Sequence, residues 1–241
     1  MTEMKVAAQT WFYGTPVVIL FACTILFLLS TNSFASEPIY RNPNLTFKPL
    51  SPAEEVRLTP SKLGQAPHLN AEEQLIIEGG EIIVRKIITK NADLHSYMAI
   101  GLVDAPPKSI MQLLRNYSGY VEFMANIQEI SVRWDKNLAV VDQTMGIALM
   151  TFRYRFNILH YQDSMIEWEY VQGDVIEMSG YYKLFPLGGN AKTLLVYRVN
   201  SDPGMPIPNF IVAYYTIVSG QNVLEAIRIA VAGRATKRNG R

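Results

Sequence analysis

The sequence predicts an α+β domain in which a curved antiparallel β-sheet wraps around a long C-terminal helix, with two short helices after an early strand. Three observations lead to this prediction. Between residues 129 and 202, successive stretches alternate apolar and polar side chains with the period of a β-strand, and short turns separate them. Residues 106–117 combine prolines with helical spacing, as at a helix start. Residues 206–235 form a longer apolar stretch with helical periodicity.

The N-terminal segment 1–35 has the layout of a secretory signal peptide. Lys5 precedes the apolar run Pro16–Leu29, and small residues follow, which predicts cleavage after Ala35. The competing interpretation is an uncleaved membrane anchor, because the mostly apolar stretch Val6–Leu29 is long enough to span a bilayer. Both interpretations predict an extracytoplasmic domain, periplasmic or secreted, that is either free or tethered to the membrane.

Composition excludes several classes of protein. The net charge of the 241 residues is +1, which gives no electrostatic footprint for nucleic acid. The single cysteine, Cys23, lies inside the N-terminal apolar run. A cleaved chain would therefore have no disulfide, no thiol nucleophile and no cysteine metal ligand.

Residues 36–71 are rich in proline and show no sustained periodicity, which predicts a linker or a strap lying over the domain. We expect the folded domain to span residues 72–235. The last residues, 236–241, form a basic tail that could touch anionic lipid heads.

The domain is expected to open with strands and two short helices. Gln74–Thr89 is rich in β-formers around a turn or bulge at Gly79-Gly80, and Ser96–Ala105 reads as another strand. Asp104 is the expected N-cap of a helix that continues to Tyr117. A second short helix is expected within Tyr120–Ile127.

A meander of strands with short turns follows. The expected strands are 129–135, 138–149, 151–161, 164–173, 175–187 and 192–202. The final helix, 206–235, carries no charge on any face between Phe210 and Gly220. A helix that is apolar all round is buried on more than one side, whereas a sheet covers only one side.

Three stretches carry a resemblance to a known superfamily. They are "VDAPPKSIMQLLRNYSGYVEFMANI", "MSGYYKLFPLGGNAKTLLVYRV" and "DPGMPIPNFIVAYYTIVSGQNVLEAIR", in that order. Together with the element order, they make residues 73–234 resemble the START/polyketide cyclase-like (SRPBCC) superfamily, and especially its coenzyme Q-binding-protein-like branch. The resemblance implies the helix-grip fold and a cavity between the sheet and the C-terminal helix that holds a lipid, a sterol-like compound, a quinone or a polyketide.

The residues themselves agree with an apolar pocket. Tyr154, Phe156, Trp168 and Tyr170 share one face of a hairpin by alternation, and the apolar helix offers Phe210, Tyr214 and Ile217. Gly220 removes bulk from the helix, which could leave room for a ligand. The competing interpretation is that these rings interdigitate as an ordinary core.

Arg153 and Arg155 alternate with the rings, so we expect them on the opposite, watered face of the sheet. The register is open: a two-residue turn at Gln162-Asp163 sets Arg155 opposite Tyr170, and a turn longer or shorter by one residue sets the arginines opposite the glutamates. If instead an arginine points inward, it is a possible contact for a ligand headgroup.

No catalytic or metal site is predicted. His68, His95 and His160 form no metal-binding pattern, and no nucleotide or hydrolase fingerprint is present. No cofactor is expected. Glu122, Asp142 and Glu177 are isolated carboxylates.

Three functions therefore remain open. The first is an exported, non-enzymatic carrier of a hydrophobic small molecule or lipid, at or near a membrane surface. The second is a polyketide cyclase or aromatase, for which Arg155, Tyr154 and His160 are the candidate acid–base groups. The third is a protein-interaction module whose core is filled by its own side chains.

Overall fold

The computed structural model describes residues 63–91, 94–124, 126–147, 150–202, 204 and 209–239. Side chains are not described at 147, 150, 209–217 and 235–239. All of these residues belong to one compact unit, Tyr40–Arg241. The predictions for segment 1–35, for most of the strap 36–71 and for the end of the basic tail therefore lie outside the described residues.

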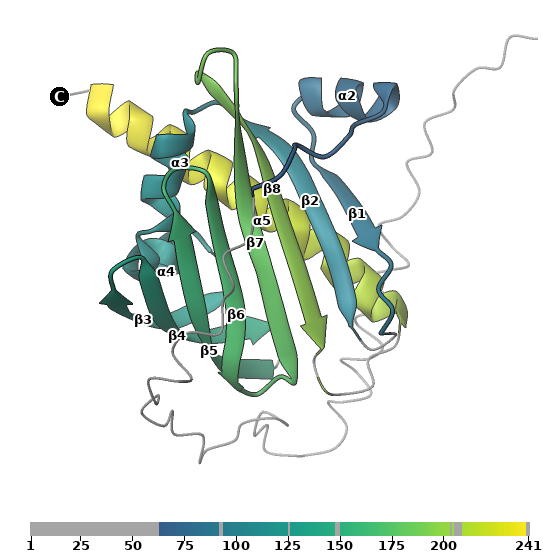
Figure 1. Cartoon of the computed structure of the whole chain (residues 1–241), viewed down its shortest axis with the longest axis vertical. Coiled ribbons are helices and arrows are strands. Elements are labelled where there is room, and N and C mark those ends of the chain that lie inside the picture. The colour runs from purple at the N-terminus through teal and green to yellow at the C-terminus, as the bar shows by residue number, and fades with distance from the viewer. Residues whose placement is uncertain are drawn as a thin grey trace, which may run out of the picture. The chain divides into compact units, whose positions relative to one another are not determined.

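Within the described residues, eight strands form one antiparallel sheet in the order β1-β2-β8-β7-β6-β5-β4-β3 (Figure 1). All neighbours from β3 to β8 are consecutive in the chain, as the predicted meander requires. The early strand β2 instead pairs with the last strand, β8. The strands are β1 Ile83–Ile87, β2 His95–Val103, β3 Ile127–Asp135, β4 Leu138–Ile147, β5 Met150–Tyr161, β6 Met165–Gly173, β7 Glu177–Leu187 and β8 Lys192–Asp202.

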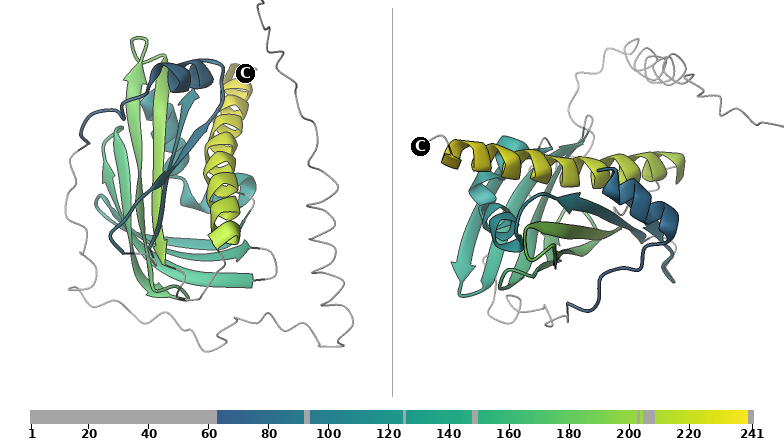
Figure 2. Two further views of the ribbon diagram at one scale, coloured as in Figure 1. Left: turned by 90° about the vertical axis from the view of Figure 1, so that its right-hand side faces the viewer. Right: turned by 90° about the horizontal axis from the view of Figure 1, so that it is seen from above.

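The helices are α2 Ala71–Glu78, α3 Pro107–Leu114, the 3-10 turn η1 Tyr117–Gly119, α4 Tyr120–Phe123 and the long α5 Asn209–Asn239. Helix α5 packs along β1, β2 and β8 and against α3 and α4. We call the sheet face that α5 covers the inner face (Figure 2). This arrangement is the predicted α+β helix-grip fold, which the structure confirms.

The main core lies between the inner face, α3, η1, α4 and the C-terminal half of α5. Leu224, Ile227 and Val231 are the buried side chains of α5 in this core, at the spacing of one helical face. Arg228 fastens the same part of the helix, since its Nε donates to the carbonyl of Leu102 at 2.7 Å and its Nη1 to the carbonyl of Gly80 at 2.8 Å.

Helix α2 corrects one prediction. Residues 74–78 were expected to form a strand, because Leu75, Ile76 and Ile77 make an apolar run. They lie in a helix whose start is fixed by a capping box: the Asn70 side chain accepts from the backbone N–H of Glu73, and the Glu73 carboxylate accepts from the backbone N–H of Asn70.

Helix α2 covers the outer face of the sheet, opposite α5. Its buried residue Ile77 packs with Ile100, Leu194 and Val196, and Leu69 from the preceding segment joins this second cluster. The part of the predicted strap that the structure describes, residues 63–70, thus leads into a cover of the outer face (Figure 2).

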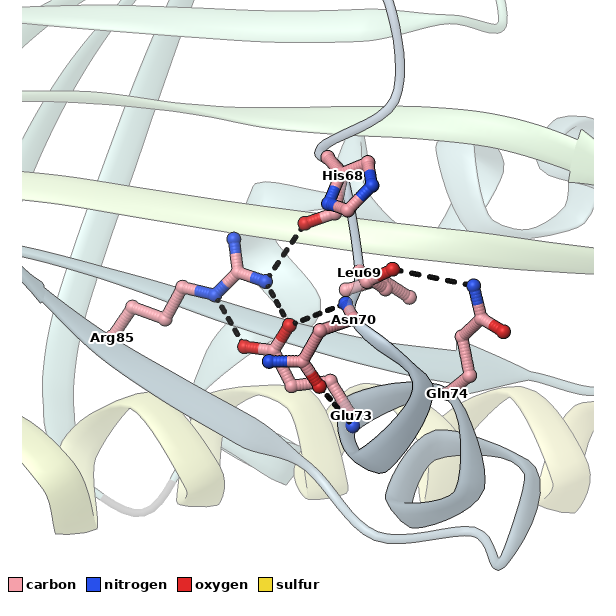
Figure 3. A network of polar contacts seen from close by, with 6 residues as sticks. All are labelled: His68, Leu69, Asn70, Glu73, Gln74 and Arg85. Atoms are coloured by element: carbon pink, nitrogen blue, oxygen red, sulfur yellow. Dashed lines mark hydrogen bonds and ion pairs between the residues drawn. The ribbon is translucent and has the colours of Figure 1, made fainter.

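A charged clasp holds α2 to the sheet edge (Figure 3). On β1, the Arg85 guanidinium donates to both oxygens of Glu73, at 2.9 and 2.6 Å, and to the carbonyl of His68 at 2.9 Å. Hydrogen bonding by Arg85 lowers the pKa of Glu73. The clasp joins the helix start, the preceding segment and the first strand.

The start of α3 also differs from the prediction. Its N-cap residue is Pro106, which offers no side-chain cap, rather than Asp104. The Asp104 carboxylate instead lies 2.9 Å from the Lys192 ammonium in an exposed ion pair. Such a pair adds little stability, so Pro106 and Pro107 set the helix start by fixing the backbone.

None of the helices in the described part of the chain is both long and apolar enough to cross a membrane.

Candidate functional site: the inner face of the sheet

The β5–β6 hairpin settles the register that the sequence left open. A three-residue turn pairs Tyr161 with Met165 and therefore Phe156 with Tyr170, and a bulge then shifts the register so that Arg155 faces Gln172. The turn is thus the alternative that is longer by one residue, but neither arginine lies opposite a glutamate as that alternative predicted.

The four predicted hairpin rings lie on the inner face. Tyr154, Phe156 and Trp168 are buried in the main core, and Tyr170 is half-buried against it. On β7, a side chain at Gly180 would collide with the indole of Trp168, since a Cβ atom there would lie 2.5 Å from Cζ2. Gly180 thus makes the space that the Trp168 ring occupies.

Further rings from β2, β7 and β8 extend this layer. Tyr197 stacks on Tyr182 at 4.9 Å between ring centroids and on Trp168 at 5.8 Å, and it meets Tyr97 edge-on at 6.1 Å. Burial raises the pKa of Tyr97 to about 12, so its phenol is neutral at ordinary pH. We call Tyr97, Tyr154, Trp168, Tyr182 and Tyr197 the aromatic layer.

Within this layer the Tyr154 hydroxyl stands out. It is buried and makes no hydrogen bond in the structure. Burial raises the pKa of Tyr154 well above its usual value; the polar side chain of Gln143, its cross-strand neighbour on β4, offsets part of this rise, and Tyr97 adds to it. Most buried hydroxyls are hydrogen-bonded, so an unpaired one inside a core calls for a partner.

Of the helix residues predicted to line a pocket, Phe210, Tyr214 and Ile217 lie in α5, and their side chains are outside the described set. Gly220 is described, and its role differs from the expectation. A Cβ atom there would lie 3.2 Å from Cβ of Ala99 and 3.3 Å from Cε2 of Tyr97. The missing side chain lets α5 approach β2 closely and leaves no empty space beside Gly220.

The predicted outer position of the arginines is correct, but Arg155 is not solvated. It is only 8% exposed, and its Nη2 donates to Oδ2 of Asp142 on β4 at 2.7 Å, with Nε bonded to Oδ1. Asp142, which the sequence left without a partner, is thus the counter-ion. Because the Arg155–Asp142 pair lies on the outer face of the sheet, the Arg155 side chain points away from the aromatic layer.

Arg153 is half-buried beside a groove of about 380 Å³ in the outer face. Glu129 and Asp142 line the same groove. Asp142 is already paired with Arg155, and the Glu129 carboxylate offsets the charge of Arg153, so the groove has no excess positive charge for an anionic ligand. Neither arginine therefore has the surroundings expected of a headgroup contact.

His160 fixes the short helices to the sheet. Its Nε2 lies 2.8 Å from the Tyr117 hydroxyl and its Nδ1 lies 3.0 Å from the carbonyl of Asn137. Burial lowers the pKa of His160 to about 4, so the ring is neutral at pH 7, with Nδ1 donating and Nε2 accepting. The indole of Trp134 packs on the same ring at 4.9 Å.

The three candidate acid–base groups are not brought together. Arg155 lies on the outer face, and Tyr154 and His160 are about 20 Å apart along β5 at the usual rise of a strand. Both ring nitrogens of His160 are already engaged in positioning contacts. The described residues also hold no group of three or more potential metal ligands.

Sequence reasoning missed Tyr97, Tyr182 and Tyr197. Each occupies an alternate position of a correctly predicted strand, so the period-two pattern places all three on one face or the other. Choosing the face requires the register between β2, β8 and β7, which joins parts of the chain that are far apart.

Comparisons with known proteins agree with this geometry. Residues 103–214 match the family model described as "Polyketide cyclase / dehydrase and lipid transport". No curated protein matches the chain in sequence.

Solved structures share the fold at low sequence identity. The STAR-related lipid transfer protein (fragment 25-204) from Xanthomonas axonopodis is 12% identical, with a TM-score of 0.56 over 63% of this chain and 93% of that one. The Zhui aromatase/cyclase from Streptomyces sp. R1128 is 18% identical, with a TM-score of 0.50 over 60% and 95%. A START superfamily protein from Mycobacterium smegmatis is 14% identical, with a TM-score of 0.50 over 63% and 97%.

The comparisons lead to one conclusion: the chain has the helix-grip fold of these solved structures, and its residues 103–214 are similar to the family of polyketide cyclases and lipid transport proteins.

Proposed function

We propose that this protein is an exported carrier that binds a hydrophobic small molecule, such as a lipid, a sterol-like compound or a quinone, between the inner face of the sheet and α5. The observation that carries the proposal is the aromatic layer. Rings from five strands gather on the face that α5 covers, and they form a wide, uncharged layer in the main core. Ligand pockets are usually lined in this way, by apolar and aromatic side chains with a few polar groups.

The arrangement supports a carrier over a cyclase. A cyclase needs acid and base groups that converge on the substrate. Here Arg155 points out of the sheet, and His160 uses both nitrogens to hold Tyr117 and Asn137. The inner face instead offers uncharged aromatic side chains, which suit the binding of an apolar molecule without a chemical reaction.

Native mass spectrometry with organic extraction of the full-length chain, purified from its source membranes, tests the proposal. The matched variants are Tyr170→Glu, which places a charge on the inner face, and Tyr181→Glu, which places the same charge on the outer face. Both tyrosines are half-buried. We expect wild type and Tyr181→Glu to carry an apolar molecule and Tyr170→Glu to lose it, while all three give the same circular dichroism spectrum.

A wild-type chain that carries nothing, and that takes up nothing from a mixture of lipids and quinones, would refute the carrier. The filled-core interaction module would then be the better hypothesis.

The export part of the proposal comes from segment 1–35 and has its own test. N-terminal sequencing of the mature protein should begin at Ser36 if the segment is cleaved, and at the start of the chain if it is an anchor. A C-terminal reporter that is active only outside the cytoplasm should be active in both cases. An inactive reporter would refute export.

A further inference from the structure

We propose that the ligand carries an uncharged hydrogen-bonding group, a hydroxyl or a carbonyl, which pairs with the Tyr154 hydroxyl, and that the inner face discriminates against anionic lipids. This inference rests on the proposed carrier function and narrows the chemical class of the cargo.

The first observation is the Tyr154 hydroxyl. The residue is 2% exposed, and its oxygen makes no hydrogen bond in the structure. Leaving a buried hydroxyl unpaired is costly, so a molecule that enters the layer and supplies a partner is favoured at this position over one that does not.

The second observation is that other inner hydroxyls are already used. The Tyr117 hydroxyl pairs with His160 at 2.8 Å, and the Tyr120 hydroxyl donates to the carbonyl of Leu114 at 2.6 Å. These two groups hold the short helices in place. Tyr154 differs from them because its hydroxyl has no backbone or histidine partner.

The third observation is where Tyr154 lies. Three strands separate β5 from β2, which is about 19 Å across a flat sheet. Yet Tyr97 lies close enough to Tyr154 to raise its pKa, and Tyr154 raises the pKa of Tyr197 in the same way. The sheet therefore curls until the Tyr154 ring reaches toward β2 and β8, across the space where a ligand would lie.

The fourth observation is the absence of charged side chains on the strands around Tyr154; the Arg228 guanidinium of α5 lies next to Gly101 of β2. Along the described parts of β4 to β8, the inner positions carry no Asp, Glu, Lys or Arg, and the one buried arginine of these strands, Arg155, is paired on the outer face. The sequence of α5 is also uncharged from Phe210 to Gly220. A carboxylate or phosphate beside Tyr154 would lose its hydration without gaining a counter-ion, whereas an alcohol or ketone needs only one neutral partner.

The experiment compares three probes with the same chain length: hexadecan-1-ol, palmitate and hexadecane. Radiolabelled probe is equilibrated between phosphatidylcholine vesicles and the full-length protein, which has been exchanged out of a high-CMC detergent, and the bound fraction is measured. Tyr154→Phe deletes the hydroxyl and keeps the ring. Tyr120→Phe is the matched control, because it makes the same chemical change at a hydroxyl that already has a partner.

We expect wild type to bind hexadecan-1-ol more tightly than hexadecane and palmitate. Tyr154→Phe should reduce the preference for the alcohol over the hydrocarbon by roughly 2- to 13-fold, the range for one neutral hydrogen bond. Its Tm without probe should not fall, since the deleted hydroxyl had no partner. Tyr120→Phe should lower the Tm and leave the preference unchanged.

The possible failures are distinguishable. If wild type binds none of the three probes or the lipid and quinone mixture, the carrier function itself is wrong. If it binds all three equally, or binds palmitate best, or if Tyr154→Phe keeps the full preference for the alcohol, the carrier stands and the assignment of a neutral polar group to Tyr154 is overturned.

Discussion

The contact of α5 with β2 yields a prediction with an internal control. Helix α5 contains two described glycines in different surroundings. A Cβ atom at Gly220 would lie 3.2 Å from Cβ of Ala99 and 3.3 Å from the Tyr97 ring, whereas a Cβ atom at Gly233 would have no neighbour within 4 Å. Replacing either glycine by alanine brings the same gain in helix propensity, about 0.5–1 kcal/mol.

The two alanine variants should therefore differ by the cost of crowding alone. Ala99 is fully buried in the middle of β2 and its Cβ cannot swing away, so we expect the extra methyl at Gly220 to cost about 1–3 kcal/mol, as overpacked cores do. Gly233→Ala should raise the free energy of unfolding by about 0.5–1 kcal/mol, and Gly220→Ala should leave it unchanged or lower it by up to about 2.5 kcal/mol.

Urea denaturation followed by tryptophan fluorescence measures both variants against wild type, and equal m-values would show that the unfolding transition is comparable. The reasoning is refuted if Gly220→Ala is as stable as Gly233→Ala. That outcome would mean that α5 can move away from β2 at no cost, and that the contact at Gly220 does not fix the distance between α5 and the sheet.

Three further predictions concern polar contacts. Arg155→Met leaves the Asp142 carboxylate without its cation and should lower the free energy of unfolding by about 3 kcal/mol. The double variant Arg155→Met with Asp142→Leu should recover at least half of that loss. Urea titrations of the single and double variants measure this, and strictly additive losses would contradict it. Burial lowers the pKa of His160 to about 4 from an unfolded value near 6.5, so the unfolded chain takes up the proton first as the pH falls. The contribution of neutral His160 to the free energy of unfolding should be fully present above pH 6.5, and about 3 kcal/mol should be lost by pH 4. His160→Gln should remove this part of the pH dependence in unfolding experiments between pH 7 and pH 4, and superimposable profiles for the two proteins would contradict the assignment. Asn70→Ala removes the side-chain cap of α2 and should lower stability by about 1 kcal/mol, whereas Gln74→Ala on the exposed side of the same helix should change the Tm little; equal effects would show that the cap is unimportant.

The strands from β3 to β8 and the final helix could be predicted because their signal is local. Alternation along a strand and spacing along a helix depend only on neighbouring residues. The same local rules failed at residues 74–78, where β-branched side chains suggested a strand. The signal for the helix was present one step earlier, in the spacing of Asn70 and Glu73, which is that of a capping box.

The site was predicted in part, and the limits have physical causes. Alternation separated Tyr154 and Trp168 from Arg155, and the structure has them on opposite faces. The alternation did not predict that Arg155 is buried, because the burial of Arg155 depends on Asp142 from the neighbouring strand and on the residues that cover the outer face. Nor did it predict the role of Gly220, since a missing side chain marks either an empty space or a close contact, and only the position of Ala99 decides between them.

The pairing of β2 with β8 also determines when the chain can fold. Ser96 and Asn200 share a hydrogen bond across this seam although they are 104 positions apart in the chain. Loop closure of this size must precede the pairing, and topologies with distant contacts fold slowly. During synthesis at about 5–20 residues per second, β2 waits for several seconds or more before its partner exists. An apolar strand is thus exposed throughout the time in which the rest of the sheet is made, and aggregation during biogenesis is expected to be most sensitive to substitutions in β2.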